Sequence, residues 1–182
     1  MSLANGLPPV AAAGARILIL GSMPGQASLA AGCYYAHPRN AFWPIMGALF
    51  GAAPELPYAE RLQCLTAAGI ALWDVIACCE RRGSLDADIV PGSVQANDFA
   101  AFFAAHPGIA RLYFNGTAAE TAFRRHVLPQ LLPQLAGSPP PGRRLPSTSP
   151  AHAARGYAEK LAAWSVLAEP DNAAAAAYNQ PF

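Results

Sequence analysis

The stretch ILILGSMPGQASLAAGCYYAHPRNAFW, residues 17–43, indicates both the fold of this chain and the position of its site. Residues 17–20 form an apolar run that has no helical period and contains β-branched residues, which predicts a fully buried strand. The strand ends at residues 21–25, GSMPG, where small and rigid residues let a ligand approach the backbone closely. Polar and aromatic side chains then crowd into one short loop, namely Tyr34, Tyr35, His37, Arg39 and Asn40. We interpret this segment as an active-site loop at the C-terminal end of a buried strand.

The length and composition describe a single domain. A chain of 182 residues can bury a substantial core. No apolar run is long enough to cross a membrane, and the N-terminus lacks the pattern of a signal peptide, so we expect a cytoplasmic protein that does not bind membranes. We expect residues 1–15 to be a flexible lead-in, residues 16–169 a single domain, and residues 170–182 an Ala-rich tail.

The cysteines, histidines and charges predict neither a metal site nor a general affinity for polyanions. The four cysteines lack CxxC spacing, which favours reduced thiols over a disulfide framework or an iron–sulfur cluster. The four histidines are scattered without the spacing of metal ligands, so we expect no metal. The net charge is +1, and basic residues cluster only in the arginine pairs 81–82, 124–125 and 143–144. These pairs suit either a solvated surface or a local polyanion contact.

Strands and helices are predicted to alternate along the chain. Apolar runs predict strands at residues 17–20, 70–77 and 109–114, and a short fourth strand is expected at residues 143–145. Helical patterns lie at residues 41–50, 58–68, 97–105, 117–127 and 157–167. This alternation predicts an α/β fold with a parallel sheet covered on both faces. Polar clusters follow each strand, at residues 21–40, 74–88, 115–116 and 147–152. They are expected to converge at the carboxyl edge of the sheet, where such folds bind ligands.

Several familiar kinds of site are absent from the sequence. There is no GxxxxGK[ST] phosphate loop and no GxGxxG dinucleotide motif. Ser147, Ser149 and His152 suggest a hydrolase triad, but no GxSxG elbow is present, so a serine esterase is a minor alternative. What remains is a pocket of aromatic, amide and hydroxyl groups, which suits the binding of a flat heterocycle.

Two segments resemble motifs of the uracil-DNA glycosylase superfamily. GSMPG at residues 21–25 with YYAHPRNAFW at residues 34–43 is similar to its first motif region, and LPSTSPAH at residues 145–152 is similar to its second motif. Within the superfamily the chain most resembles the hypoxanthine-DNA (deoxyinosine) glycosylase branch, and GIALWDVI at residues 69–76 followed by GSLD at residues 83–86 also fits that branch. The similarity extends over residues 16–167.

The resemblance implies a three-layer α/β/α sandwich around a four-stranded parallel sheet. It also implies a monofunctional enzyme that hydrolyses the bond between a deaminated base and deoxyribose, without a cofactor and without cleaving the strand. Its partner is DNA that contains such a base, and we expect a monomer. Other branches place the water with an Asp or Asn where this chain has Met23, so the role passes to Asn40, and efficient removal of uracil is in doubt.

The same resemblance assigns the remaining site residues. Tyr35 is expected to stack on the flipped base, with Ser22, Met23 and Asn115 also at the base. Gly21, Gly25, Ser147, Ser149 and His152 are expected to contact DNA phosphates.

Structural alternatives remain open for several of these residues. Asn40 could instead cap the following helix. Asn115 could close a turn, and His152 could be an ordinary surface residue. Asp74 is expected to be structural or to lie at the pocket edge. The rival functions are a uracil or mismatch-specific glycosylase and a non-catalytic nucleic-acid-binding module on the same fold.

Overall fold

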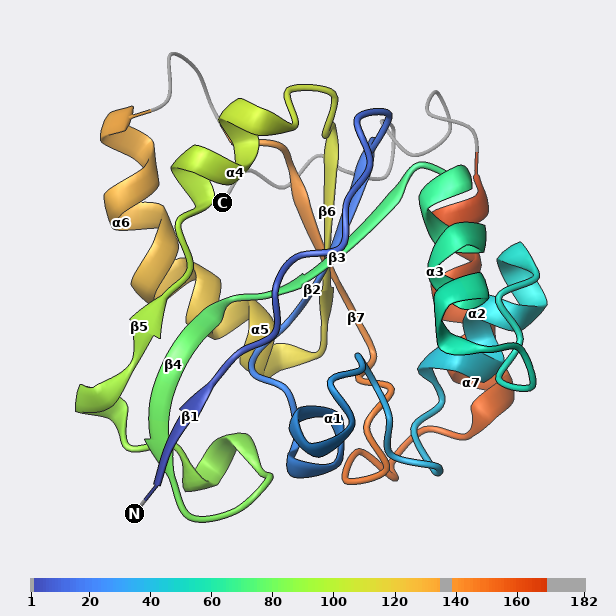
Figure 1. Ribbon diagram of the computed structural model, residues 1–182, viewed down its shortest axis with the longest axis horizontal. Coiled ribbons are helices and arrows are strands. Elements are labelled where there is room, and N and C mark those ends of the chain that lie inside the picture. The colour runs from blue at the N-terminus through green and yellow to red at the C-terminus, as the bar shows by residue number, and fades with distance from the viewer. Residues whose placement is uncertain (1, 135–138, 170–182) are drawn as a thin grey trace.

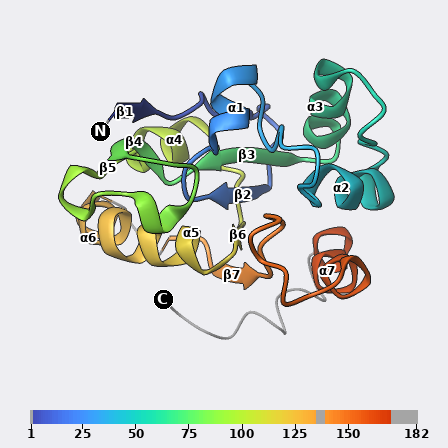
Figure 2. The ribbon, with the colours of Figure 1, turned by 90° about the horizontal axis from the view of Figure 1, so that it is seen from below.

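The computed structural model describes residues 2–134 and 139–169, and a four-stranded parallel sheet lies at its centre (Figure 1). Its strands are β2 (Ile17–Gly21), β3 (Ile70–Asp74), β6 (Arg111–Asn115) and β7 (Gly142–Leu145). They lie in the order β3-β2-β6-β7, and every neighbouring pair is parallel (Figure 2). The predicted parallel sheet is therefore confirmed, with β2 in its interior.

Helices cover both faces of this sheet (Figure 1). One group consists of α2 (Phe42–Phe50), α3 (Tyr58–Ala67) and α7 (Tyr157–Trp164), and the other of α4 (Phe99–Ala105), α5 (Thr117–Ala122) and α6 (Leu128–Leu131). The short α1 (Gln26–Ala31) follows β2. A π-helical segment, η3 (Phe123–Val127), joins α5 to α6, and single 3-10 turns lie at η1 (Asp86–Asp88), η2 (Pro91–Ser93), η4 (Leu132–Gln134) and η5 (Ser165–Ala168).

The two-residue period of the strands divides the core between the two helical layers. In β2, Leu18 and Leu20 belong to the core cluster beneath α4, α5 and α6, whereas Ile17 and Ile19 belong to the cluster beneath α2, α3 and α7. Both faces are apolar because both are covered, which explains why the strand reads as a continuous apolar run. The three-layer α/β/α fold predicted from the resemblance is confirmed.

The N-terminal segment differs from the prediction. Instead of a flexible lead-in, β1 (Ser2–Asn5) pairs antiparallel with β4 (Ile76–Arg81), and Val10 forms a bridge with Leu72. The hydroxyl of Tyr34 also donates to the carbonyl oxygens of Leu7 and Pro8, at 3.2 and 2.9 Å. Backbone hydrogen bonds order this segment, and its Ala- and Pro-rich composition gives no sign of them. The predicted Ala-rich tail at residues 170–182 lies outside the described residues.

The strand predicted at residues 70–77 is also divided in the structure. It breaks at Val75, whose backbone N–H donates to the carbonyl of Gly21 at 2.9 Å. Beyond the break, β4 leaves the parallel sheet and forms an antiparallel sheet with β1 and β5 (Gln95–Ala96). The break matters for the site because it turns the chain after β3 across the end of β2.

None of the helices in the described ranges is long and apolar enough to span a membrane.

Candidate active site

The loops after β2, β4, β6 and β7 meet at the lower edge of the sheet in Figure 1. Residues of these loops line a pocket of about 270 Å³. Nine of the predicted site residues line it, namely Gly21, Ser22, Met23, Gly25, Tyr35, Asn40, Asn115, Ser147 and Ser149. His152, the tenth, is exposed and does not line it. The structure therefore brings together segments that are more than a hundred residues apart, as the convergence of strand ends predicts.

The end of β2 approaches the pocket too closely for any side chain at residue 21. A Cβ on Gly21 would clash with Oδ1 of Asp74 and would lie 3.4 Å from the hydroxyl oxygen of Tyr35. The neighbouring Ser22 hydroxyl donates to Oδ1 of Asp86, and Met23 is buried in the core at 7% exposure. Contacts with other parts of the chain therefore hold this loop in place, namely the packing of Met23 in the core and the hydrogen bond from Ser22 to the segment after β4.

The ring of Tyr35 is fixed in an unusual backbone conformation. Tyr35 has a φ of 55°, the left-handed region, and its ring stacks on Phe42 with centroids 3.9 Å apart and planes 23° from parallel. A base can therefore stack only on the side of the ring opposite Phe42. The hydroxyl is buried without a hydrogen-bond partner among the described residues. Burial and the nearby Asp74 raise the pKa of Tyr35, while the Asn115 amide acts in the opposite sense.

The side chain of Asn40 is oriented by the helix that it precedes. Its Oδ1 accepts a hydrogen bond from the backbone N–H of Phe42 at 3.0 Å. Asn40 lies one residue before the N-cap position of α2, which Ala41 occupies. The capping alternative for Asn40 is therefore correct in substance, because the first-turn amide is satisfied by this side chain. The remaining lone pair of Oδ1 and the Nδ2 group make no hydrogen bond within the described chain. Both the cap and a role in the pocket are thus compatible with one orientation of the amide.

The second loop is tied to the end of β6 by a reciprocal pair of hydrogen bonds. Nδ2 of Asn115 donates to the hydroxyl of Thr148 at 2.9 Å, and the backbone N–H of Thr148 donates to Oδ1 of Asn115 at 2.8 Å. The carbonyl of Thr148 in turn accepts from the backbone N–H of Ala41 at 3.0 Å, which joins the two motif loops directly. Asn115 therefore braces the loop, and its predicted contact with the base is left to one N–H and one lone pair.

A buried lysine supports the same loop from below. Lys160, the single lysine of the chain, is 5% exposed and donates to the carbonyl oxygens of His152 and Ser149 at 2.9 and 3.5 Å. Burial lowers the pKa of Lys160. The indole N–H of Trp164 donates to the carbonyl of Pro146 at 2.9 Å. The motif segments assign no function to Lys160 or Thr148, and the sequence marks Lys160 only as the single lysine beside eleven arginines.

The electrostatics of the pocket centre on Asp74. Asp74 is 3% exposed, and its Oδ2 has no hydrogen-bond partner among the described residues. Burial raises the pKa of Asp74 to about 7, the negative charge of Asp86 adds to the rise, and Arg81 opposes it. Burial likewise raises the pKa of Asp86, against its hydrogen bond from Ser22 and the charge of Arg81. Near neutral pH a large fraction of the Asp74 carboxyl is therefore protonated.

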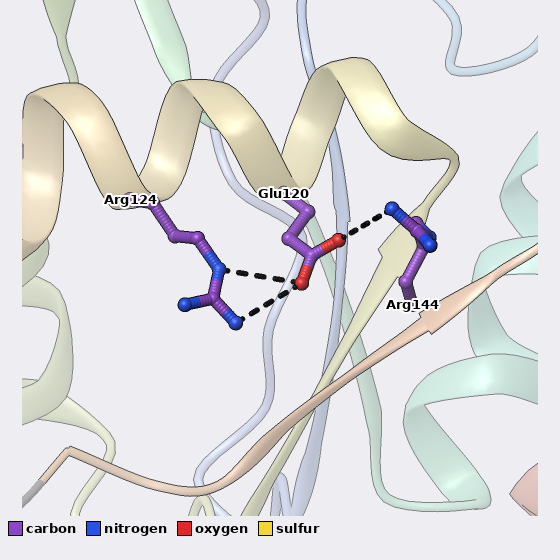
Figure 3. Close-up of polar contacts among 3 residues, drawn as sticks. All are labelled: Glu120, Arg124 and Arg144. Carbon is purple, nitrogen blue, oxygen red and sulfur yellow. Dashed lines mark hydrogen bonds and ion pairs between the residues drawn. The ribbon is translucent and has the colours of Figure 1, made fainter. Parts of the chain in front are cut away.

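One arginine of each pair makes a contact within the chain, and none of the six lines the pocket. Arg81 is buried and donates to the carbonyl of Pro24, so it holds the GSMPG loop in place. Arg124 and Arg144 both contact Glu120, at 3.2 and 3.1 Å (Figure 3). The side chains of these two arginines are about half exposed, so the contacts stabilise the surface by less than about 1 kcal/mol each. At least one member of each pair thus has a structural role, and no group of three potential metal ligands occurs within the described residues.

Comparison with known proteins identifies the family. The model of the uracil DNA glycosylase superfamily matches residues 8–168. The chain belongs to this superfamily. The match confirms the family predicted from the two motif segments.

Curated relatives and a solved structure agree with this assignment. A relative from Methanosarcina barkeri is 37% identical over 113 residues, which cover 62% of this chain and 70% of the relative. A second, from Methanosarcina acetivorans, is 35% identical over 116 residues, which cover 63% and 72%. Both are named hypoxanthine DNA glycosylase. The solution NMR structure of a proposed uracil DNA glycosylase from M. acetivorans superposes with a TM-score of 0.70 at 29% identity, covering 92% of this chain and all of that one.

Proposed function

We propose that this superfamily member is a monofunctional DNA glycosylase that releases a flipped deaminated base, with hypoxanthine as the preferred base. The observation that carries the proposal is the Asn40 carboxamide, which the Phe42 amide holds in one orientation at a pocket lined by Tyr35 and both motif loops. The relatives named hypoxanthine DNA glycosylase support the choice of base. We also propose that the enzyme acts as a cytoplasmic monomer.

The target base must leave the duplex to reach this pocket. Extruding a base costs a few kcal/mol, and less when the base is mispaired, as hypoxanthine is opposite thymine. Tyr35 offers the ring face opposite Phe42 for stacking, and Ser22 and Met23 border the same space. Tyr35 has a φ of 55°, and its ring is held against the ring of Phe42. The Tyr35 side chain therefore loses little conformational freedom when the base binds.

Asn40 is proposed to place the attacking water. One lone pair of its Oδ1 binds the Phe42 amide, and the other lone pair and Nδ2 are free to hold a water molecule against C1′ of the sugar. A carboxamide cannot act as a base near neutral pH, so Asn40 contributes by positioning. Met23, buried in the core, offers no polar group for this task.

The motif loops are proposed to bind the DNA backbone on either side of the lesion. The hydroxyls of Ser147 and Ser149 accept from the backbone N–H groups of Ser149 and Ala151, both at 3.2 Å, and each retains its own O–H to donate to a phosphate. The backbone of Gly21 and Gly25 and the exposed His152 complete the predicted phosphate contacts. A contact between Asn115 and the base also stays a prediction. Two hydrogen bonds with Thr148 already occupy part of the Asn115 amide.

The test is a cleavage assay on oligonucleotides that each carry one hypoxanthine, uracil, xanthine or thymine mispair, with alkali to reveal abasic sites. We expect abasic sites chiefly from hypoxanthine. The Asn40→Ala variant is expected to lose more than about 100-fold in rate while still binding DNA. Asn5→Ala, in β1 outside the pocket, is the matched control and should retain the wild-type rate. Release from uracil alone would overturn the preferred base, and release from no substrate with intact DNA binding would favour the non-catalytic module.

A further inference from the structure

Two buried polar groups at the pocket lack partners within the described chain. These are Oδ2 of Asp74 and the hydroxyl of Tyr35, and both residues line the pocket. They approach each other across Gly21, since Oδ1 of Asp74 and the Tyr35 hydroxyl both border the place that a Cβ on Gly21 would occupy. Buried polar groups are almost always hydrogen-bonded in folded proteins. Two unsatisfied groups side by side in one pocket therefore point to a polar ligand that completes them.

The fold does not use the Asp74 carboxyl for its own support. Asp74 ends β3, and the structural contact at this point is made by its backbone carbonyl, which accepts from Nδ2 of Asn97 at 2.8 Å. The side chain makes no ion pair in the described part of the chain. The charge of Arg81 acts on this carboxyl, but Arg81 donates its hydrogen bond to the carbonyl of Pro24. Asp74 is 3% exposed, its Oδ1 packs against Gly21, and its Oδ2 has no hydrogen-bond partner among the described residues, so Oδ2 is available to a ligand.

Burial and the facing Asp86 favour the neutral form of this carboxyl. Asp86 comes from the loop after β4 and is negatively charged when ionised, Tyr34 and Tyr35 come from the first motif loop, and Arg81 comes from β4. His37 lines the same pocket from the first loop. Arg81 is the one of these that favours an ionised Asp74, and its effect is smaller than that of burial. An unpaired carboxylate in such surroundings is costly, whereas a carboxylic acid carries an O–H that it can donate.

We propose that Asp74, in its protonated form, is the general acid that assists departure of the base. The inference rests on the proposed function. The carboxylic O–H donates to an acceptor atom of the flipped base, and the proton moves to the base as the bond from C1′ to the base nitrogen breaks. The electron pair of that bond goes to the base, the oxygen of the water held by Asn40 bonds to C1′, and a proton from that water replaces the one that Asp74 gave. The free base and the abasic sugar are both neutral after this step, and the Asp74 carboxyl is protonated again.

The experiment is a pH profile of single-turnover base release from a hypoxanthine oligonucleotide between pH 5 and 9. We expect the wild-type rate to fall about tenfold per pH unit above pH 7, because only the protonated enzyme can give the proton. Asp74→Asn keeps the shape and a hydrogen-bond donor but cannot transfer a proton. It should be about 100-fold slower at pH 6 and should show no further fall up to pH 9. Asp98→Asn removes a carboxylate at the N-cap of α4, outside the pocket, and should reproduce the wild-type profile.

The outcomes separate this inference from the proposed function. An Asp74→Asn enzyme that matches the wild-type rate at pH 6, or that falls with the wild-type slope above pH 7, overturns the role of Asp74. If that variant does not fold, the wild-type profile decides alone, and a rate that stays level from pH 6 to 9 overturns the inference. Base release with such a level profile leaves the glycosylase assignment intact. A wild-type enzyme that releases no base at any pH refutes both.

Discussion

Replacing Asp74 with Asn is expected to change the pH dependence of folding stability, whatever the activity of the variant. The pKa of Asp74 is raised from 3.8 to about 7 in the folded protein. The folded state therefore binds this proton more tightly than the unfolded state, and the stability gained from it is complete below about pH 4. That stability is lost as the pH rises toward 7.

The size of the effect follows from the two pKa values. Their difference of about 3 corresponds to about 4 kcal/mol at 1.36 kcal/mol per pKa unit. Asp74→Asn cannot ionise, so its free energy of unfolding minus that of the wild type should rise by about 4 kcal/mol between pH 4 and pH 8. Taking the difference cancels the other titrating groups that the two proteins share.

The assay is urea unfolding of both proteins at each pH unit from 4 to 8, followed by tryptophan fluorescence. Asp98→Asn serves as the control, because Asn caps a helix as well as Asp does and its carboxylate lies outside the pocket. The stability of this control relative to the wild type should change little with pH. A difference between Asp74→Asn and the wild type that stays constant within about 1 kcal/mol would show that Asp74 is ionised normally in the folded protein.

Further predictions concern the support of the second loop. Asn115→Ala removes both hydrogen bonds to Thr148 and should lower the free energy of unfolding by about 2–3 kcal/mol; a loss below about 0.5 kcal/mol in urea unfolding would contradict the bracing role. Lys160→Met keeps the apolar stem but loses the charged hydrogen bonds to two loop carbonyls, so we expect a loss of about 2 kcal/mol and faster amide exchange in residues 147–152, and unchanged exchange would argue against it. Gly116→Ala should destabilise by more than about 2 kcal/mol, because φ is 95° and the new Cβ would lie 2.8 Å from that of Ser147. Gly92→Ala, with nothing within 4 Å of its Cβ, should change the melting temperature little, and equal losses in the two variants would refute the steric argument.

The parallel sheet could be predicted because each of its main strands is marked by a short apolar stretch of neighbouring residues. The residues of β2, β3 and β6 are apolar on both faces, and each strand ends in a polar cluster, so the sequence alone places the site at one edge of the sheet. The pairing of β1 with β4 could not be predicted in this way. Its register depends on backbone hydrogen bonds between residues more than seventy positions apart, and four residues of mixed character carry no period.

The candidate site shows the same division. Nine of the ten predicted residues line one pocket. They could be predicted because each motif follows a strand and so lies in a loop at the carboxyl edge of the sheet. What each side chain contacts there depends on its neighbours in space. Asn115 follows a strand as a base-reading residue would, yet its amide is paired with Thr148. Asp74 reads as an ordinary strand-end residue, and only the assembled fold shows that its carboxyl is buried without a partner among the described residues.

The most direct test of the proposed glycosylase reaction is to identify the released product. A duplex with a single hypoxanthine opposite thymine is incubated in H₂¹⁸O with the wild type or with Asn40→Ala, and free bases and the DNA strand are analysed by mass spectrometry. We expect free hypoxanthine and an intact strand whose abasic sugar carries one ¹⁸O, with both products lost in Asn40→Ala. Hypoxanthine release that persists unchanged in Asn40→Ala, or a wild type that releases no base at all, would contradict this expectation.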